Sequence, residues 1–215
     1  AGSAWLMMGR LFALGAIAAF GLAIFVGALS AIDSIFESRD QWYAEGHLAD
    51  LELRVVADDV ANFPRFDDIP GVDGYRLRMI FPASLDINKD NRLPALLIAA
   101  TTNSTLPINT QKIIEGKALD LHDHNGVLIE RNLARYHAIK VSDTLNVKLG
   151  KENVLLKVRG IVQDAEFLLA PANPSLFVPS KGSLGVLYAN PQILSERFGF
   201  TPVNSVLFRL TPGAN

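Results

Sequence analysis

The strongest pattern along the chain is a long apolar run near its beginning, bounded by Arg10 and Asp33. Residues 11–32 contain no charged residue and no proline. At about 1.5 Å per helical residue, the run reaches about 33 Å and can cross a hydrocarbon core of about 30 Å. A helix that is apolar on every face over such a length is rare in soluble domains. The pattern therefore predicts a transmembrane helix over residues 11–32, preceded by a cytoplasmic N-terminus or tag remnant at residues 1–10.

The helical pattern continues beyond the apolar run. Residues 30–49 contain no proline, and Gly46 is their only glycine. Ile32, Ile35 and Phe36 recur at near-helical spacing, with charged residues between them. This predicts a helical stalk over residues 33–49 that is continuous with the membrane span at least to Phe36.

The remaining residues, 50–215, alternate between short strand and helix patterns. The predicted helices are one with Pro64 early in it, one over residues 131–137, and one that Pro191 opens and Gly199 stops. Alternating or continuous apolar runs predict strands over residues 50–56, 75–80, 95–100, 127–130, 145–149, 154–162, 184–189 and 204–210. We therefore expect an α+β domain with a mixed or largely antiparallel sheet, built as one domain or two lobes.

Flanking charges predict the orientation of the span. Arg10 precedes it, whereas acidic residues dominate just after it. The positive-inside bias then places the N-terminus in the cytoplasm and the globular part outside. A cleaved signal peptide ending near Ala28-Leu29-Ser30 is the alternative, but the apolar run exceeds the usual apolar region of such peptides. Both interpretations place residues 50–215 outside the cytoplasm.

Composition excludes several kinds of partner. The formal net charge of −2 gives no basic surface for nucleic acid, so we expect no nucleic-acid partner. The chain has no cysteine, which rules out zinc sites built on thiolates.

No motif indicates catalysis. The pairs Gly116-Lys117 and Gly150-Lys151 lack the earlier glycine and the following hydroxyl of a phosphate-binding loop. Residues 181–185 read KGSLG, which has lysine where a nucleophile elbow has glycine. We therefore predict no catalytic residue, no cofactor and no enzymatic activity.

His122-Asp123-His124 is the best metal candidate, with Asp120 as a further oxygen ligand. Two histidines that are two residues apart face the same side only in an extended segment. His47 and His137 would have to come from elsewhere in the fold. We interpret the stretch as a solvated loop before Asn125-Gly126 and predict no metal site.

One uncharged segment stands out, residues 167–180, which read FLLAPANPSLFVPS. Its three prolines exclude a regular helix or a central strand. Such a segment either packs against the core or is presented to a partner or lipid. The candidate side chains for a partner or substrate surface are Phe167, Leu168, Leu169 and Phe177.

Five short motifs occur in an order that resembles the periplasmic core domain of MacB/FtsX-type ABC transporter permeases. Those domains read IPGV, EGR.L, a strand followed by LA, GDTL and V.GIV. The corresponding stretches here are residues 69–72 (IPGV), 114–119 (IEGKAL), 127–134 (VLIERNLA), 141–145 (VSDTL) and 158–162 (VRGIV). Ser142 replaces the usual glycine, and Lys117 replaces the usual arginine.

The resemblance implies a permease subunit of the bacterial inner membrane that continues into further membrane helices. Its implied partners are a cytoplasmic ABC ATPase subunit, a second permease copy or half, a periplasmic adaptor protein and membrane lipid. The domain would transmit ATPase-driven motion for export or extraction of a substrate, with residues 50–215 as the periplasmic core domain. A membrane-tethered sensor or scaffold ectodomain is the alternative, and an anchored hydrolase is a third option.

Overall fold

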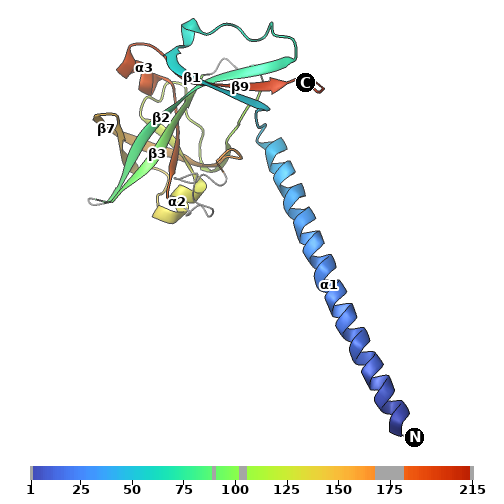
Figure 1. Cartoon of the computed structure of the whole chain (residues 1–215). Helices are drawn as coiled ribbons and strands as arrows, with labels where there is room; N and C mark the ends of the chain where they lie inside the picture. Colours follow the sequence, from blue (N-terminus) through green and yellow to red (C-terminus); the bar gives the residue numbers. More distant parts are fainter. Residues whose placement is uncertain (1, 89–90, 102–105, 168–181, 214–215) are drawn as a thin grey trace. The chain divides into compact units, whose positions relative to one another are not determined.

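The computed structural model describes residues 2–88, 91–101, 106–167 and 182–213 (Figure 1). The chain divides into two compact units, the second of which begins at Gly46. The first unit is a single helix, α1 (Gly2–Glu45), which passes Phe36 without a break. Residues 46–49, which the sequence assigned to the stalk, belong to the second unit.

The second unit is built around one mixed sheet with two short helices. The helices are α2 (Arg131–His137) and α3 (Gln192–Phe198). The strands are β1 (Leu51–Asp59), β2 (Val72–Asn88), β3 (Asn91–Ala100), β4 (Lys112–Gly116), β5 (Gly126–Glu130), β6 (Thr144–Leu149), β7 (Glu152–Gln163), β8 (Gly185–Ala189) and β9 (Pro202–Leu210). The α+β class is confirmed, and these residues form one unit rather than two lobes.

Six of these strands close on themselves as a small barrel. Neighbouring pairs run β2–β3, β3–β8, β8–β5, β5–β7, β7–β6 and β6–β2. Strand β2 makes closure possible because it is long: residues 72–78 pair with β9, and residues 83–86 pair with β6. Strands β1 and β9 therefore extend the sheet beside one half of β2, and β4 extends it beside β7. The pairs β3–β8 and β5–β7 are parallel.

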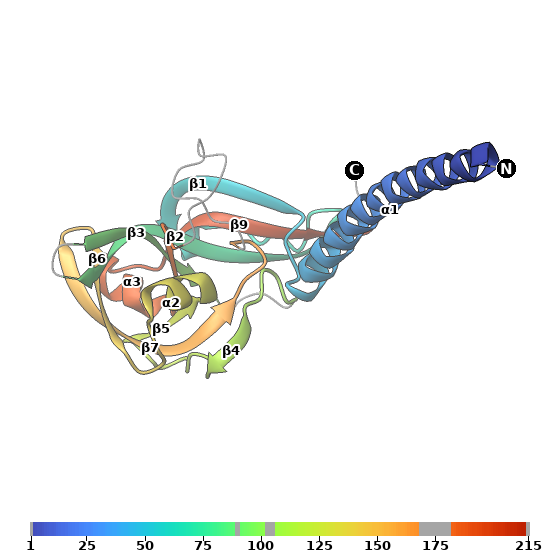
Figure 2. The same ribbon diagram turned by 90° about the horizontal axis from the view of Figure 1, so that it is seen from below.

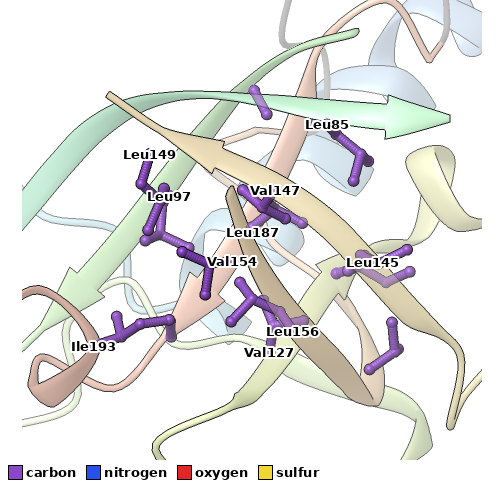
Figure 3. Packing of buried hydrophobic residues seen from close by; sticks show 14 of the residues in the cluster. Leu85, Leu97, Val127, Leu145, Val147, Leu149, Val154, Leu156, Leu187 and Ile193 are labelled. Carbon is purple, nitrogen blue, oxygen red and sulfur yellow. The ribbon is translucent and has the colours of Figure 1, made fainter. Parts of the chain in front are cut away.

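The main hydrophobic core fills this barrel (Figure 3). Leu85, Leu97, Val127, Val147 and Leu187 are each 0% exposed and come from five different strands. Figures 1 and 2 together show α3 and α2 at opposite ends of the barrel. The core cluster includes Leu133 and Ala134 of α2 and Ile193 and Leu194 of α3, so each helix closes one end with apolar side chains.

Two smaller clusters cover the sheet outside the barrel. One is formed by Ile80, Ile98, Leu128, Val162, Val186 and Tyr188, with Leu119 and Phe167 packed on it. The other lies on β2 and β9 around Leu77, Val206 and Phe208, where Phe66 makes edge-to-face contacts with Tyr75 and Phe208. Strands β5 and β8 are buried along their whole length, which explains their continuous apolar sequences.

Local signals place both short helices where the sequence predicted them. The Glu130 carboxylate caps α2 by accepting from the backbone N–H of Asn132 at 2.7 Å and of Leu133 at 3.1 Å. Gly199 ends α3 in the left-handed conformation at φ +74°. Strands β6 and β7 form the predicted hairpin, with Leu149 opposite Glu152 and a tight turn at Gly150-Lys151.

The helix expected around Pro64 is wrong. The structure has a 3₁₀ turn at Val60–Asn62 instead, and Asp59 caps it by accepting from the Ala61 N–H at 3.2 Å. Phe63 then returns to extended backbone at φ −81° and ψ 134°. A residue before proline disfavours the helical region, so the turn ends before Pro64 rather than starting there. Strand β4 was not predicted.

Ser142 has the backbone conformation that explains the glycine at this place in the GDTL motif. The Asp143 N–H donates to the Lys140 carbonyl at 3.1 Å, which closes a turn with Ser142 at its third position. Ser142 has φ +78°. A turn of this kind requires positive φ there, which glycine adopts freely and residues with a Cβ do not.

We expect Ser142→Gly to stabilise the protein by about 0.5–1 kcal/mol, because relief of strain outweighs the extra entropy of glycine in the unfolded chain. The measurement is urea or thermal unfolding of the full chain in detergent micelles. Ser142→Ala is the matched control, since it keeps the Cβ and should bring no gain. An equal gain from alanine would assign the effect to the hydroxyl group and contradict the strain.

Candidate functional site

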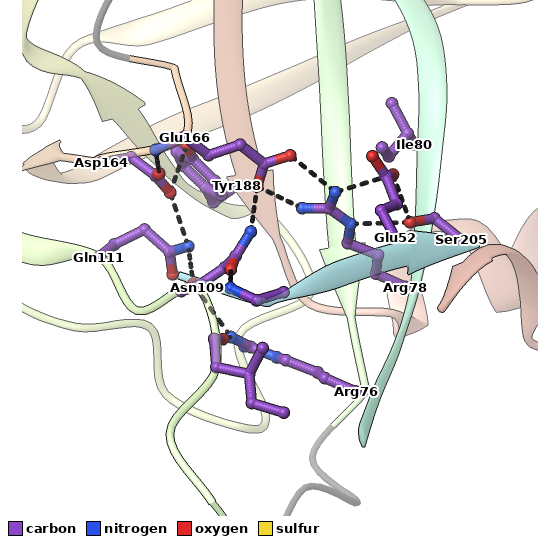
Figure 4. Close-up of polar contacts among 12 residues, drawn as sticks. Glu52, Arg76, Arg78, Ile80, Asn109, Gln111, Asp164, Glu166, Tyr188 and Ser205 are labelled. Carbon is purple, nitrogen blue, oxygen red and sulfur yellow. Dashed lines mark hydrogen bonds and ion pairs between the residues drawn. The ribbon is translucent and has the colours of Figure 1, made fainter. Parts of the chain in front are cut away.

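A buried cluster of charged and polar side chains lies on the face of β2 that points away from the barrel interior (Figure 4). Met79 points into the core, so Arg76 and Arg78 lie on the opposite face. We call this cluster the Arg78 network. Its members are Glu52 of β1, Arg76 and Arg78 of β2, Ser205 of β9, Tyr188 of β8, Asn109 and Gln111 before β4, and Asp164 and Glu166 after β7.

Arg78 is the centre of the network and is 3% exposed. Its Nη1 and Nη2 atoms donate to the two carboxylate oxygens of Glu166 at 2.6 and 2.7 Å. Nη2 also donates to Glu52 at 3.0 Å, and Nε donates to Ser205 Oγ at 3.1 Å. A forked pair of this kind is among the stronger hydrogen-bonded contacts in proteins. Burial alone lowers the pKa of Arg78, but the two carboxylates outweigh burial and raise it.

Asp164 is the second buried charge centre of the network. It is 2% exposed and accepts from the Tyr188 hydroxyl at 2.8 Å, from Gln111 Nε2 at 2.9 Å and from the Glu166 N–H at 2.7 Å. Burial raises the pKa of Asp164 in spite of these donors. The pKa of the Tyr188 hydroxyl is also raised, first by burial and then by the nearby charge of Asp164. The hydroxyl therefore remains a donor to Asp164 at neutral pH.

Asn109 connects the network to the first residues of the second unit. Its Nδ2 donates to Glu166 at 2.5 Å, and its Oδ1 accepts from the Ala49 N–H at 2.7 Å. Its own N–H donates to the His47 carbonyl at 2.9 Å, and the Thr110 N–H donates to the Gly46 carbonyl at 2.9 Å. The Arg209 guanidinium reaches the Leu48 carbonyl at 2.9 Å. The four residues that follow α1 are thus hydrogen-bonded to the loop before β4 and to β9.

Arg76 lies beside a cavity of about 210 Å³. Its Nη1 donates to the carbonyls of Ile108 and Asn109 at 2.7 and 3.2 Å. Burial and the neighbouring Arg78 lower its pKa. The cavity is also lined by Thr101, Gln111, Tyr188, Asn190 and apolar side chains. It is smaller than most pockets for organic ligands, which run to about 300–1,000 Å³, so it supports no ligand assignment.

The geometry of the Arg78 network indicates a structural role that holds segments of the domain together. The carboxylate oxygens of Glu166 and Asp164 accept hydrogen bonds from donors within the network. Among the described residues, neither carboxylate contacts a serine or threonine hydroxyl that it could activate as a nucleophile. Two of the histidines have separate partners: His124 Nδ1 lies 2.5 Å from Glu196 Oε1, and His137 Nε2 lies 2.9 Å from the Gly182 carbonyl oxygen. Over the described ranges, no group of three or more His, Asp or Glu residues is placed to hold a metal ion. The expected absence of enzymatic activity stays a prediction.

The structure describes only one of the four candidate surface residues. Phe167 is half-buried and packs on the cluster around Ile98 and Tyr188. Leu168, Leu169 and Phe177 lie outside the described residues. Their assignment to a partner surface stays a prediction.

The sequence did not indicate the Arg78 network. Residues 75–80 read YRLRMI, and the alternation predicts arginines that face water. The available signal was the presence of two arginines on one face of a strand whose other face is apolar, together with the acidic pair Asp164 and Glu166 after an apolar strand. Pairing across 88 residues of sequence cannot be deduced from such a pattern.

The motifs that carry the family resemblance have structural roles. Gly116 of β4 lies opposite Gly160 of β7, and the Lys117 N–H donates to the Arg159 carbonyl at 3.0 Å. A Cβ on Gly116 would lie 2.3 Å from that carbonyl oxygen, and a Cβ on Gly160 would lie 2.8 Å from the Lys117 carbonyl oxygen. The EGK and RGIV motifs are therefore two sides of one close backbone contact, which only glycine permits.

Comparisons with known proteins give structural neighbours alone. No family model matches the chain, and no curated protein matches it. The extracellular domain of the noncanonic ABC-type transporter YknZ from Gram-positive bacteria aligns with a TM-score of 0.49 and 11% identity, over 73% of this chain and 75% of that one. The periplasmic region of MacB from Actinobacillus actinomycetemcomitans aligns with a TM-score of 0.48 and 13% identity, over 76% of this chain and 68% of that one.

A domain of a protein assigned as a permease from Porphyromonas gingivalis aligns with a TM-score of 0.37 and 17% identity, over 69% of this chain and 60% of that one. All three neighbours are thus domains of transporters or of a protein assigned as a permease. With every TM-score below 0.5, these likenesses carry no conclusion about activity, substrate or partners.

We expect Arg78→Leu to lower the free energy of unfolding by about 2–4 kcal/mol, because it removes a buried cation and leaves the half-buried Glu166 without its partner. Unfolding of the full chain in detergent by urea measures this change. Arg54→Leu is the matched control on β1, the strand beyond β9. Its side chain is 64% exposed and, among the described residues, forms an ion pair with Glu52 alone, so its effect should stay within about 0.5 kcal/mol. Equal effects of the two variants would contradict the central role of Arg78.

Glu52 and Asp164 should contribute to pH dependence with opposite signs. Burial raises the pKa of Glu52, but the bonds from Ser205 and Arg78 outweigh burial and lower it. Its stabilisation is therefore present above the ordinary carboxyl pKa and is lost as the pH falls through the folded-state pKa. The pKa of Asp164 is raised by burial, so stability decreases as the pH rises through the window above the ordinary value.

Urea unfolding of the wild type, Glu52→Gln and Asp164→Asn between about pH 3 and pH 7 tests these signs. The stability of the wild type relative to Glu52→Gln should increase with pH. Its stability relative to Asp164→Asn should decrease with pH. Two curves that move in the same direction would show that one of the two environments is misassigned.

Proposed function

We propose that the chain is the first membrane helix and extracytoplasmic domain of an ABC transporter permease subunit in the bacterial inner membrane. The order of the five motifs supports this family. The domain transmits ATPase-driven motion across the membrane for export or extraction of a substrate, and ATP hydrolysis belongs to a separate cytoplasmic ATPase subunit or domain. A second permease copy or half, membrane lipid and a periplasmic adaptor protein are the proposed partners.

The membrane assignment is supported by the exposure of α1. Over residues 14–45 this helix is long and apolar enough to cross a membrane, judged by length and composition. Phe20, Ile24 and Phe25 are 58–69% exposed, although they are large apolar side chains. Lipid contact would remove this surface from water, at about 25 cal/mol for each Å². We assign residues 11–32 to the span, 33–49 to the stalk and its attachment, and 50–215 to the extracytoplasmic domain.

The observation that carries the proposal is the attachment of the chain directly after α1. A single helix extends from the predicted span to Glu45, and residues 46–49 are held by Asn109, Thr110 and Arg209. Asn109 is bonded to Glu166, which is bonded to Arg78 in the middle of the sheet. Displacement of residues 46–49 is therefore passed to buried groups of the domain, not absorbed by a flexible linker.

We expect nucleotide to change the distance between spin labels on Val56→Cys in two copies of the complete permease bound to its ATPase. Val56 is 90% exposed, and residues 1–215 contain no cysteine, so one label reports on the domain once any cysteines in the rest of the permease and in the ATPase have been replaced. Gly-Ser-Gly inserted between Glu45 and Gly46 should abolish the change, because a flexible linker does not transmit displacement. Pulsed electron paramagnetic resonance with and without trapped nucleotide measures the distance.

The same insertion after Gly150 is the matched control. It lies in the exposed turn between β6 and β7, where a Cβ would meet nothing within 4 Å. This variant should keep the nucleotide-dependent change. A change that survives insertion at Gly46 would argue against transmission through the stalk, and a wild type without any change would argue against a moving domain.

A further inference from the structure

Strand β1 presents an open edge of the sheet. It stands at the end of the strand order and, among the described residues, it pairs only with β9. All of its residues except Asp59 are exposed. The strand contains no proline and no lysine, which are common protections of a sheet edge. A register shift follows Arg54, so the regular part of this edge is its first half.

The sequence of this regular edge is complementary to itself. Residues 51–55 read Leu-Glu-Leu-Arg-Val. In an antiparallel pair centred on Leu53, each Glu52 lies opposite an Arg54 and each Leu51 lies opposite a Val55. Opposite charges and apolar side chains that face each other across two strands each stabilise the pair by about 0.2–1 kcal/mol. A twofold axis duplicates every such contact.

We propose that β1 is the surface on which two copies of this chain pair in one of the two nucleotide states, edge to edge and antiparallel, with Leu53 opposite Leu53. The inference rests on the proposed function, which supplies the partner, a second permease copy. It adds which strand forms the interface, in which register, and through which contacts. The two sheets would then continue into each other across the twofold axis.

The side chains on both faces of β1 are suited to contact a second copy of β1. Leu51 and Leu53 lie on the face of Phe208 and Val206, which belong to a buried cluster, yet they are 53% and 46% exposed. A second β1 would place Leu53 against Leu53 and Leu51 against Val55. On the other face, Glu52 Oε1 accepts from Arg78 at 3.0 Å, from Ser205 at 2.7 Å and from Arg54 Nε at 3.0 Å. In the described part of the chain, the other oxygen, Oε2, has one weak contact, at 3.5 Å from Arg54 Nη2. That oxygen can accept from Arg54 of the other copy.

The register is also compatible with two chains anchored in one membrane. With Leu51 opposite Val55, the two Leu51 residues lie four positions apart along the pair, which is about 13 Å. Each is six residues beyond Glu45, the last residue of α1. Packed helices have axes about 8–10 Å apart, so this separation allows neighbouring membrane spans. Two tethered copies also meet at a raised effective concentration, so a small contact suffices.

Cysteine cross-linking in membranes tests the pairing, because the chain has no cysteine of its own. Leu53→Cys places two thiols opposite each other, at a Cα separation within the range of a disulfide whether or not the central pair is hydrogen-bonded. We expect its oxidation to a covalent dimer to be about tenfold faster than that of Val56→Cys. Val56 is the matched control because it is on the same strand and more exposed, at 90%, but would face residue 50 of the other copy.

Two further variants test the register and the charges. Leu51→Cys and Val55→Cys should cross-link when chains carrying each are coexpressed, but not when either is expressed alone. Arg54→Glu turns both cross-strand ion pairs into repulsions and should slow Leu53→Cys cross-linking about tenfold. Circular dichroism of the Arg54→Glu variant confirms that the fold is kept.

Equal rates for Leu53→Cys and Val56→Cys, or no effect of Arg54→Glu, would overturn the proposed pairing. Such a result beside an intact nucleotide-dependent change at Val56 would remove the edge contact and leave the permease assignment. Leu53→Cys cross-linking that is fast in one nucleotide state and slow in the other would support both proposals. Fast cross-linking in both states, without a change at Val56, would keep the pairing and remove the transport role.

Discussion

The buried guanidinium of Arg78 is the constraint on which the outer layer of this domain depends. A cation removed from water costs several kcal/mol unless carboxylates and hydrogen bonds replace its hydration. Here the replacements come from β1, β9 and the segment after β7, which are separated widely in sequence. The same Glu166 that pairs with Arg78 holds Asn109, and Asn109 holds the chain after α1. One desolvated charge thus links β1, β9, the segment after β7, the loop before β4 and the chain after α1.

The barrel beneath this layer depends on a different condition, the length of β2. Because its two halves have different neighbours on the same edge, the sheet closes through β6 while β9 and β1 continue beside it. Closure creates an interior filled by branched aliphatic side chains, and two short helices cover its ends. The barrel removes the edges of its six strands but leaves β1 and β4 as edges of the extensions. The open edge of β1 is therefore a product of the topology and not an accident of its sequence.

The sequence predicted those elements whose signals are local. Helix α2 has a carboxylate cap and good helix formers, α3 has its proline and glycine, and the β6–β7 hairpin has Gly150 at its turn. The sequence did not predict features that depend on residues far away along the chain. Strand β4 is short and fully exposed, and the Gly116–Gly160 contact that positions it brings together residues 44 positions apart. Arg78 looks like a solvent-facing strand residue until Glu166 and Glu52 are placed around it.

The motifs that carry the family resemblance give information on folding rather than on substrate. Gly71 and Ser142 sit in turns at positive φ, Gly116 and Gly160 allow two backbones to approach, and Glu130 caps a helix. These residues specify how the chain folds. A permease that moves its extracytoplasmic domain as a rigid body needs such a framework more than a binding pocket, because displacement is lost wherever a joint is soft. Under the proposed function, an ATPase-driven displacement would enter the domain at residues 46–49, which Asn109, Thr110 and Arg209 hold by hydrogen bonds.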